Sequence, residues 1–93
     1  MSQPPVVSII TVTFNAQDIV RATIESVLQQ TYPHIEYILV DGASKDATFD
    51  IIQEYAQAQP ERIRHTLSEK DRNNYDAMNK GLRLATGDFV WFL

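Results

Sequence analysis

Short apolar segments alternate along the chain with longer segments in which apolar residues recur every three or four positions. The first apolar segment, Val6 to Phe14, is rich in β-branched residues and almost continuously apolar, which is typical of a strand buried on both faces. The second, Ile35 to Asp41, lies between Pro33 and Gly42 and is apolar near its end. We expect the first to be a central parallel strand and the second to pair in the same sheet.

The segment between these strands predicts an amphipathic helix. Asn15 can cap its start, and Pro33 stops any helical continuation. Four apolar residues follow the spacing i, i+4, i+7 and i+8, namely Val20, Ile24, Val27 and Leu28. The chain therefore completes a β-α-β unit by residue 41.

A second helix is predicted between "GASKDAT" and Pro60. Ser44 or Asp46 can cap its start, and Pro60 ends it. The apolar residues that share its spacing are Phe49, Ile52, Tyr55 and Ala56. Apolar and polar residues then alternate over residues 62–67, which predicts a half-exposed strand at an edge of the sheet.

The last part of the chain predicts a third helix and a fourth strand. The residues Met78, Leu82 and Ala85 share one helical face, and Gly87 ends the helix. The run Phe89 to Leu93 has the composition of a buried strand. The order β-α-β-α-β-α-β predicts an α/β fold with a mainly parallel four-stranded sheet and helices on both faces, because parallel strands need crossover connections.

Composition narrows the classes of function. The chain has 93 residues, which allows one domain at most, with 44% hydrophobic and 22% charged residues, as in folded globular proteins. Its net charge of -4 argues against nucleic acid as a partner. The absence of cysteine excludes disulfides and thiolate chemistry. The sequence contains neither a signal peptide nor an apolar run near the roughly 18 residues of a membrane span, so we expect a cytoplasmic protein.

Ligands of open α/β sheets bind beyond the carboxyl ends of the strands. Asp41 follows "ILV" directly, so its carboxylate is expected in that crevice, where it can accept a hydrogen bond from the imide of a pyrimidine base or from ribose hydroxyls. The alternative is an aspartate that only stabilises the turn at Gly42. Position alone leaves both open.

Three blocks of sequence carry a resemblance to a known family. They are "VSIITVTFNA", "SVLQQTYPHIEYILVDGASKDAT" and "YDAMNKGLRLATGDFVWFL". Together they resemble the N-terminal half of a family 2 glycosyltransferase with the GT-A fold, from about Val6 to Leu93. The resemblance implies that residues 1–93 are the incomplete, Rossmann-like nucleotide-binding part of such a domain. It also implies transfer of a sugar from a nucleoside diphosphate sugar, UDP-linked, to an acceptor hydroxyl, with inversion.

The resemblance assigns roles to the first two strand ends. Asp41 matches the aspartate that contacts the nucleotide base. The segment that includes Val12, Phe14 and Asn15 matches the one that lines the base pocket, with Phe14 in the place usually taken by tyrosine. A phenylalanine there can stack on the base or pack in the core.

The block "DRNNYDAMNKG" matches a second part of the site. The resemblance implies that Asp71 contacts the nucleotide, and that Asp76 either contacts it or stabilises the helix dipole. Asn73 stands where the family has a glycine, and asparagine can adopt the positive φ that such a turn requires. Asp46 is expected to serve as a helix cap, and Lys80 and Arg83 to form a solvated face.

The resemblance also implies a metal site and a catalytic base that are formed by other residues of the full enzyme. The D-x-D motif that binds a divalent metal, Mn or Mg, is expected just after Leu93. Neither metal ligands nor a catalytic base are therefore expected in residues 1–93, and no metal is expected to be bound to them. The chain is therefore expected to be an inactive fragment, prone to self-association through its last strand. The full enzyme is expected to act in polysaccharide synthesis for the cell wall or capsule, at the cytoplasmic face of the membrane, on a glycan or lipid-linked acceptor.

Two alternatives have different consequences. A nucleotidyltransferase-like nucleotide binder calls for a glycine- and basic-rich first loop, but that loop reads "TFNAQD". A non-enzymatic α/β interaction module would bind no nucleotide, and a nucleotide titration discriminates it.

Overall fold

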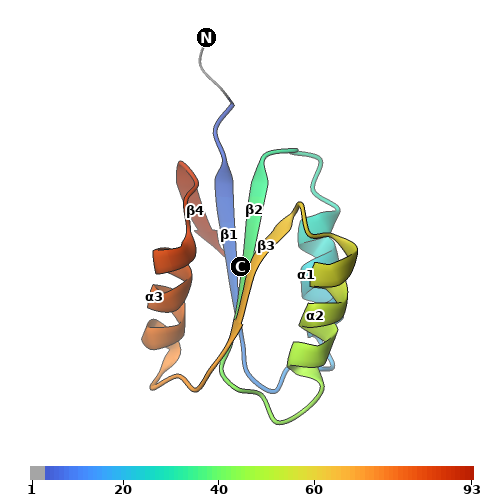
Figure 1. Cartoon of the computed structure of the whole chain (residues 1–93), viewed down its shortest axis with the longest axis vertical. Helices are drawn as coiled ribbons and strands as arrows, with labels where there is room; N and C mark the ends of the chain where they lie inside the picture. Colours follow the sequence, from blue (N-terminus) through green and yellow to red (C-terminus); the bar gives the residue numbers. More distant parts are fainter. Residues whose placement is uncertain (1–3) are drawn as a thin grey trace.

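The computed structural model describes residues 4–93 as one parallel sheet with helices on both faces (Figure 1). The elements follow the predicted order: β1 (Val7–Thr13), α1 (Val20–Leu28), β2 (Ile35–Asp41), α2 (Thr48–Ala58), β3 (Ile63–Ser68), α3 (Asn74–Leu84) and β4 (Phe89–Phe92). The sheet has the strand order β3-β2-β1-β4 and every pairing is parallel. The predicted α/β fold class is therefore confirmed, including the position of β3 at an edge.

The register of the central strands brings their carboxyl ends together. β1 pairs with β2 from Val7 with Ile35 through to Thr13 with Asp41, so these two strands end side by side. β3 is added beyond β2, whereas β4 pairs with the opposite edge of β1. The strand order thus reverses at β1, which places a crevice for ligands at its carboxyl end.

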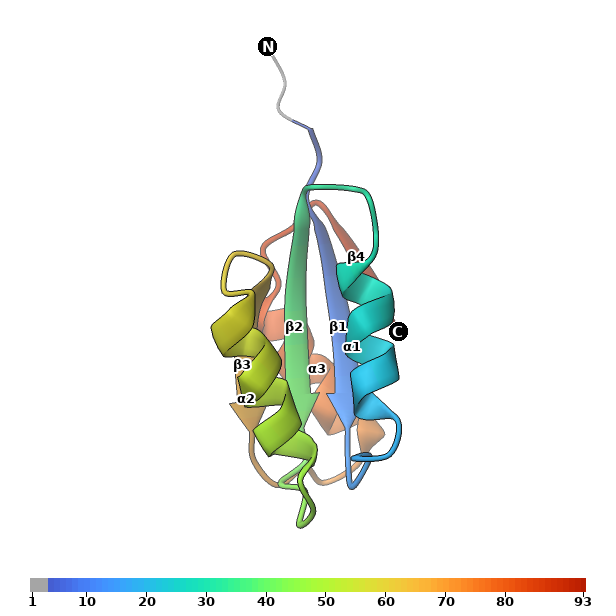
Figure 2. The ribbon, with the colours of Figure 1, turned by 90° about the vertical axis from the view of Figure 1, so that its right-hand side faces the viewer.

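Each face of the sheet has its own core. Helices α1 and α2 cover one face and α3 covers the other (Figures 1 and 2). The first core contains the buried residues Ile9, Val20, Ile24, Val27, Ile35, Tyr37, Leu39, Ile52 and Ile63. The second contains Ile10, Ile38, Val40 and Ala77. All seven residues of β2 are buried, which agrees with its central position. None of the helices in residues 4–93 has the length and apolarity needed to cross a membrane.

Helix α3 buries a different face from the one that its sequence predicted. Leu82 is 43% exposed, whereas Ala77 is only 4% exposed, and Gly81 is buried as well. A Cβ atom at Gly81 would lie 2.5 Å from Cγ2 of Ile10, so the missing side chain is what lets α3 approach β1 closely. Of the predicted stripe, Ala85 packs against the second core.

The starts of the first two helices also differ from expectation. Asn15 does not cap α1, because the helix begins at Val20 and its N-cap position, Ile19, makes no side-chain capping hydrogen bond. For α2, Asp46 is the residue whose carboxylate accepts from the backbone N–H of Thr48. Both helices end before the prolines that follow them.

Strand β4 is exposed rather than buried. Its four side chains are 36% to 64% exposed, and Trp91 is the most exposed of them. The strand pairs with β1 alone, and no helix in residues 4–93 covers it (Figure 1). The prediction of a strand here is confirmed, but the prediction that it is buried is wrong.

A buried glutamate holds the amino end of the sheet. Glu36 on β2 accepts hydrogen bonds from the Ser8 hydroxyl (2.8 Å), and from the hydroxyl (2.6 Å) and N–H (2.8 Å) of Thr86. Burial raises the pKa of Glu36, but the hydrogen bonds from Thr86 and Ser8 outweigh burial, so the pKa lies below its ordinary value. Glu36 thus joins β1, β2 and the turn before β4.

Candidate functional site

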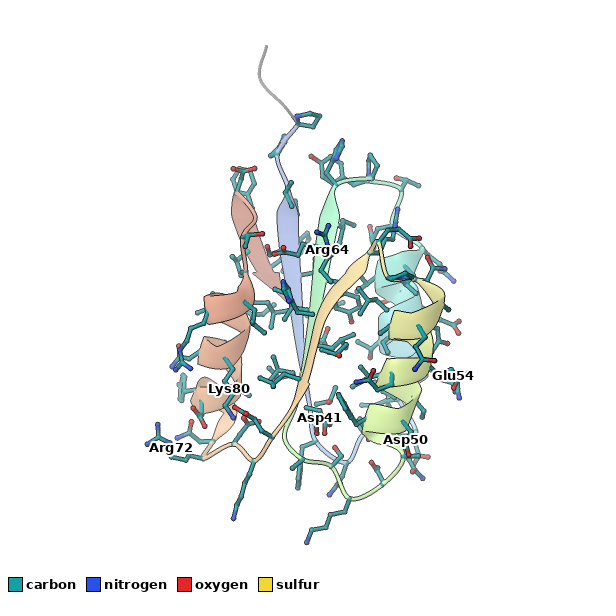
Figure 3. The ribbon with its side chains drawn as sticks, in the orientation of Figure 1. Asp41, Asp50, Glu54, Arg64, Arg72 and Lys80 are labelled. Carbon is teal, nitrogen blue, oxygen red and sulfur yellow. The ribbon has the colours of Figure 1, made fainter. Side chains whose placement is uncertain are left out.

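A buried carboxylate ties together the carboxyl ends of β1, β2 and β3 (Figure 3). Oδ1 of Asp41 accepts from the hydroxyls of Thr13 (2.7 Å) and Ser44 (2.6 Å). Oδ2 accepts from the Ser44 N–H (2.8 Å) and the Ser68 hydroxyl (2.9 Å). A carboxylate offers about four lone-pair positions, and donors of the chain fill them. A donor from a ligand would therefore have to replace one of these groups or share its position.

The loops after β1 and β2 are hydrogen-bonded to each other. The N–H of Asn15 donates to the Ser44 hydroxyl (2.7 Å), and Oδ1 of Asn15 accepts from the Lys45 N–H (2.8 Å). Asn15 and Ala43 both have positive φ, at 48° and 60°. Asn15 therefore fixes the geometry of the loop after β1. It does not line the crevice that is described below.

Asp46 has a structural role at the start of α2, although Ala47 and not Asp46 occupies the N-cap position. It accepts from Thr48 and, at 3.3 Å, from the N–H of Gln17 in the loop after β1. These hydrogen bonds, that of the Thr48 side chain above all, hold the pKa of Asp46 below its ordinary value. The carboxylate thus joins the same two loops at a second point.

A crevice of about 330 Å³ opens between the end of β1 and the loop that joins β3 to α3. Its walls are formed by Val12, Thr13, Phe14, Gly42, Lys70, Asp71, Asn73 and Ala77. The volume is at the lower end of the range of small-molecule sites. Four residues predicted for the site meet here: Val12, Phe14, Asp71 and Asn73. The ring of Phe14 is 62% exposed, so it stands free in the crevice wall instead of packing in the core.

Gly42 brings the backbone after β2 against the opposite wall. A Cβ atom at this position would lie 2.9 Å from Oδ2 of Asp71 and 3.5 Å from Cδ1 of Phe14. Any larger residue would push one of these side chains away. The absence of a side chain at Gly42 therefore sets the spacing between Phe14 and Asp71.

The first turn of α3 is closed by two reciprocal hydrogen bonds. Asn73 is the N-cap, and its Oδ1 accepts from the Asp76 N–H (2.9 Å), while Asp76 accepts from the Arg72 N–H (3.0 Å). The Arg72 N–H is the main reason that the pKa of Asp76 is lowered, and the charge of Lys80 adds to it. Asn73 has φ -168°, so the positive φ expected there is wrong and the asparagine acts as a cap.

Lys80 is buried, in contrast to the predicted solvated face. It is 9% exposed, and its ammonium group lies 2.5 Å from Asp71 Oδ1, 3.1 Å from Glu69 Oε1 and 3.1 Å from the carbonyl oxygen of Lys70. Asp76 lies at 3.7 Å. The hydrogen bond to Asp71 is the largest influence that raises the pKa of Lys80, so the side chain stays charged.

The described residues offer no site for a divalent metal ion, and the resemblance does not place its ligands among them. Residues 4–93 contain no group of three or more histidine, cysteine, aspartate or glutamate side chains placed to hold an ion. The three carboxylates that converge near the crevice, Glu69, Asp71 and Asp76, surround the ammonium group of Lys80, which already supplies the positive charge.

Comparison with known sequences decides the family. The sequence model described as "Glycosyl transferase family 2" matches residues 8–93. The chain belongs to glycosyl transferase family 2. One similar relative is TuaG of Bacillus subtilis (strain 168), which is named for a glycosyltransferase role in teichuronic acid biosynthesis. It is 44% identical over 89 residues, which are 96% of this chain and 35% of TuaG. The chain thus spans about a third of the length of the curated family 2 relatives that it matches.

Two solved structures have the same fold as this chain. The mannosyltransferase PcManGT from Pyrobaculum calidifontis, in complex with GDP-Man and Mn2+, superposes with a TM-score of 0.84 at 31% identity, over 96% of this chain and 27% of PcManGT. S. aureus TarS 1–349, in complex with UDP-GlcNAc, superposes with a TM-score of 0.81 at 24% identity, over 95% of this chain and 26% of TarS. The expected GT-A architecture is thereby confirmed.

Proposed function

We propose that the crevice binds the nucleotide of a nucleoside diphosphate sugar, UDP-linked, and that the full protein transfers this sugar to an acceptor hydroxyl with inversion. The crevice lies at the carboxyl end of β1, where the strand order reverses, which is the usual ligand position in such sheets. The similarity to PcManGT, whose structure contains GDP-Man, supports a nucleoside diphosphate sugar as the donor.

The exposed ring of Phe14 carries the proposal. An aromatic side chain that is 62% exposed gives up the stability of core packing, and a planar base in the crevice would cover it. Asp71, whose side chain is 13% exposed, lines the same crevice and offers carboxylate oxygens to ribose hydroxyls. A base would contact Asp41 by displacing a donor such as the Ser68 hydroxyl or by sharing its position.

We propose that the metal ligands and the general base that the reaction needs lie outside residues 4–93. A divalent ion, Mn or Mg, would stabilise the charge of the leaving diphosphate in the full protein, and a general base would contribute about 10² to 10⁴ in rate. We therefore propose that the 93-residue chain transfers no sugar by itself. We place the full protein at the cytoplasmic face of the membrane, in the synthesis of a cell-wall or capsule polysaccharide on a glycan or lipid-linked acceptor.

Calorimetric titration with UDP tests the binding site, with GDP as the comparison nucleotide. Phe14→Ala should weaken UDP binding by about 2- to 13-fold, the equivalent of an aromatic contact of ~0.5–1.5 kcal/mol. Phe89→Ala is the matched control, because Phe89 is 61% exposed and lies at the opposite end of the sheet. Equal affinities of the two variants for UDP, or no UDP binding by the unchanged chain, would refute the proposed site and favour an interaction module.

The absence of transfer is tested separately. The unchanged chain is incubated with UDP-sugars, with and without manganese, and release of free sugar is measured against buffer. We expect no release above buffer and a UDP affinity that manganese does not change. Manganese-dependent tightening would reveal a metal site within these 93 residues.

A further inference from the structure

Lys80 is not among the residues that line the crevice, but it holds the loop that forms one of its walls. Its ammonium group has three protons and lies within 3.1 Å of three acceptors, all of them in residues 69–71 of the loop between β3 and α3. Lys80 itself belongs to α3, which is packed on β1 and β2 (Figure 3). The loop is therefore bound to a rigid helix through one buried side chain.

This connection continues into the crevice through Asp71. Oδ1 of Asp71 receives the Lys80 hydrogen bond, while Oδ2 lies against Gly42, 2.9 Å from where a Cβ atom would be. The position of Lys80 thus determines how closely the loop approaches the backbone after β2. That distance is the width of the crevice between its two polar walls.

We propose that Lys80 is a positioning residue for nucleotide binding, which draws the 69–71 loop inward and aims Asp71 into the crevice. The proposal rests on the proposed function, because it names the ligand of the same site. Removal of the ammonium group would leave Glu69, Asp71 and Asp76 close together without a cation, and their mutual repulsion would open the loop. The sequence predicted only a solvated helix face for Lys80, because a lysine on an amphipathic helix is usually exposed.

Two measurements on the 93-residue chain test the proposal. The first is the position of the Gly42 and Asp71 backbone amide resonances without ligand, and the second is UDP affinity by calorimetry. Lys80→Met should shift both resonances and weaken UDP binding roughly tenfold, within the range of coupling between contacting residues. Lys80→Arg should restore part of the affinity. Lys45→Met is the matched control, since Lys45 is exposed in the loop after β2.

A double-mutant cycle separates positioning from general destabilisation. If Lys80 acts through Asp71, Lys80→Met should change UDP affinity less than about twofold in an Asp71→Asn background. An undiminished tenfold loss in that background, or normal affinity of Lys80→Met, would overturn the proposal. If Lys80→Met does not fold, the same cycle is run with Lys80→Arg. Absence of UDP binding by the unchanged chain would instead refute the proposed function, while the amide resonances would still decide whether Lys80 holds the loop.

Discussion

Replacement of Asp41 gives the most specific test of the way the strand ends are held. The carboxylate is fully buried and accepts four hydrogen bonds, one from the Ser44 N–H and three from hydroxyls. Asp41→Ala removes all four acceptor positions. Each buried donor left without an acceptor costs about 1–3 kcal/mol, but hydroxyls can rotate toward other partners, so we expect a total loss of about 3–5 kcal/mol. A chain of this length has roughly 5–14 kcal/mol of stability in total.

Asp41→Asn should cost much less, about 1–2 kcal/mol, for a geometric reason. The amide oxygen can face the Ser44 N–H and the Ser68 hydroxyl, while the amide nitrogen faces the hydroxyls of Thr13 and Ser44, both of which can accept. The Ser44 hydroxyl already accepts from the Asn15 N–H, and its second lone pair can accept from the new amide nitrogen. The hydroxyl proton of Ser44, which the carboxylate accepts in the wild type, is then left without a partner.

Urea unfolding followed by circular dichroism measures both changes. Asp50→Ala is the control, because Asp50 is an exposed aspartate in the first turn of α2, where removal of the charge should cost at most about 0.5–1 kcal/mol (Figure 3). The expected order of stability is wild type, Asp41→Asn, then Asp41→Ala. If the two Asp41 variants are equally stable, or if Asp41→Ala costs no more than the Asp50 control, the four hydrogen bonds do not hold the strand ends together.

Three further predictions concern other features. Ala43→Gly should raise the free energy of unfolding by about 0.5–1 kcal/mol, because glycine relieves the positive φ of 60°, and a lower urea midpoint would contradict it. The pKa of Glu36 in the folded chain is below its ordinary value of 4.5. The ionised carboxylate therefore stabilises the fold above that pH, and this contribution is lost as the pH falls through the folded pKa. Glu36→Gln should thus lose less free energy of unfolding than wild type between pH 7 and pH 3. The exposed apolar side chains of β4 should cause self-association, which sedimentation at micromolar concentrations would disprove by showing a clean monomer.

Periodicity predicted the elements better than their contacts. β1, β2 and the helices α1 and α2 followed from apolar patterns because their buried faces are made of large side chains. The pattern failed for α3, since that helix packs through Ala77 and Gly81, and a glycine contact leaves no hydrophobic signal. The exposure of β4 could not be predicted from its sequence pattern either. An apolar pattern indicates that a strand favours burial, but it does not show whether another element covers the strand.

The candidate site was predictable by strand position but not by hydrogen bonding. Asp41 was identified because it ends a strand, and strand ends meet at one edge of a parallel sheet, whereas Phe14 was identified from the family resemblance. The donors to Asp41 come from three separate segments, and only the folded chain shows that Thr13, Ser44 and Ser68 converge there. The burial of Lys80 depends likewise on a loop that folds back over α3, so its charge alone predicted exposure.

The pairing of β4 with β1 has a consequence for synthesis of the chain. β1 and β2 are complete by residue 41, but the other edge of β1 is paired only when residues 89–92 arrive. At ~5–20 residues per second, the intervening stretch of about 50 residues takes roughly 2–10 seconds to translate. During that time the nascent chain carries an apolar strand with one row of free backbone donors and acceptors. That interval is the window in which a chaperone, or a neighbouring nascent chain on the same messenger, competes with β4 for β1.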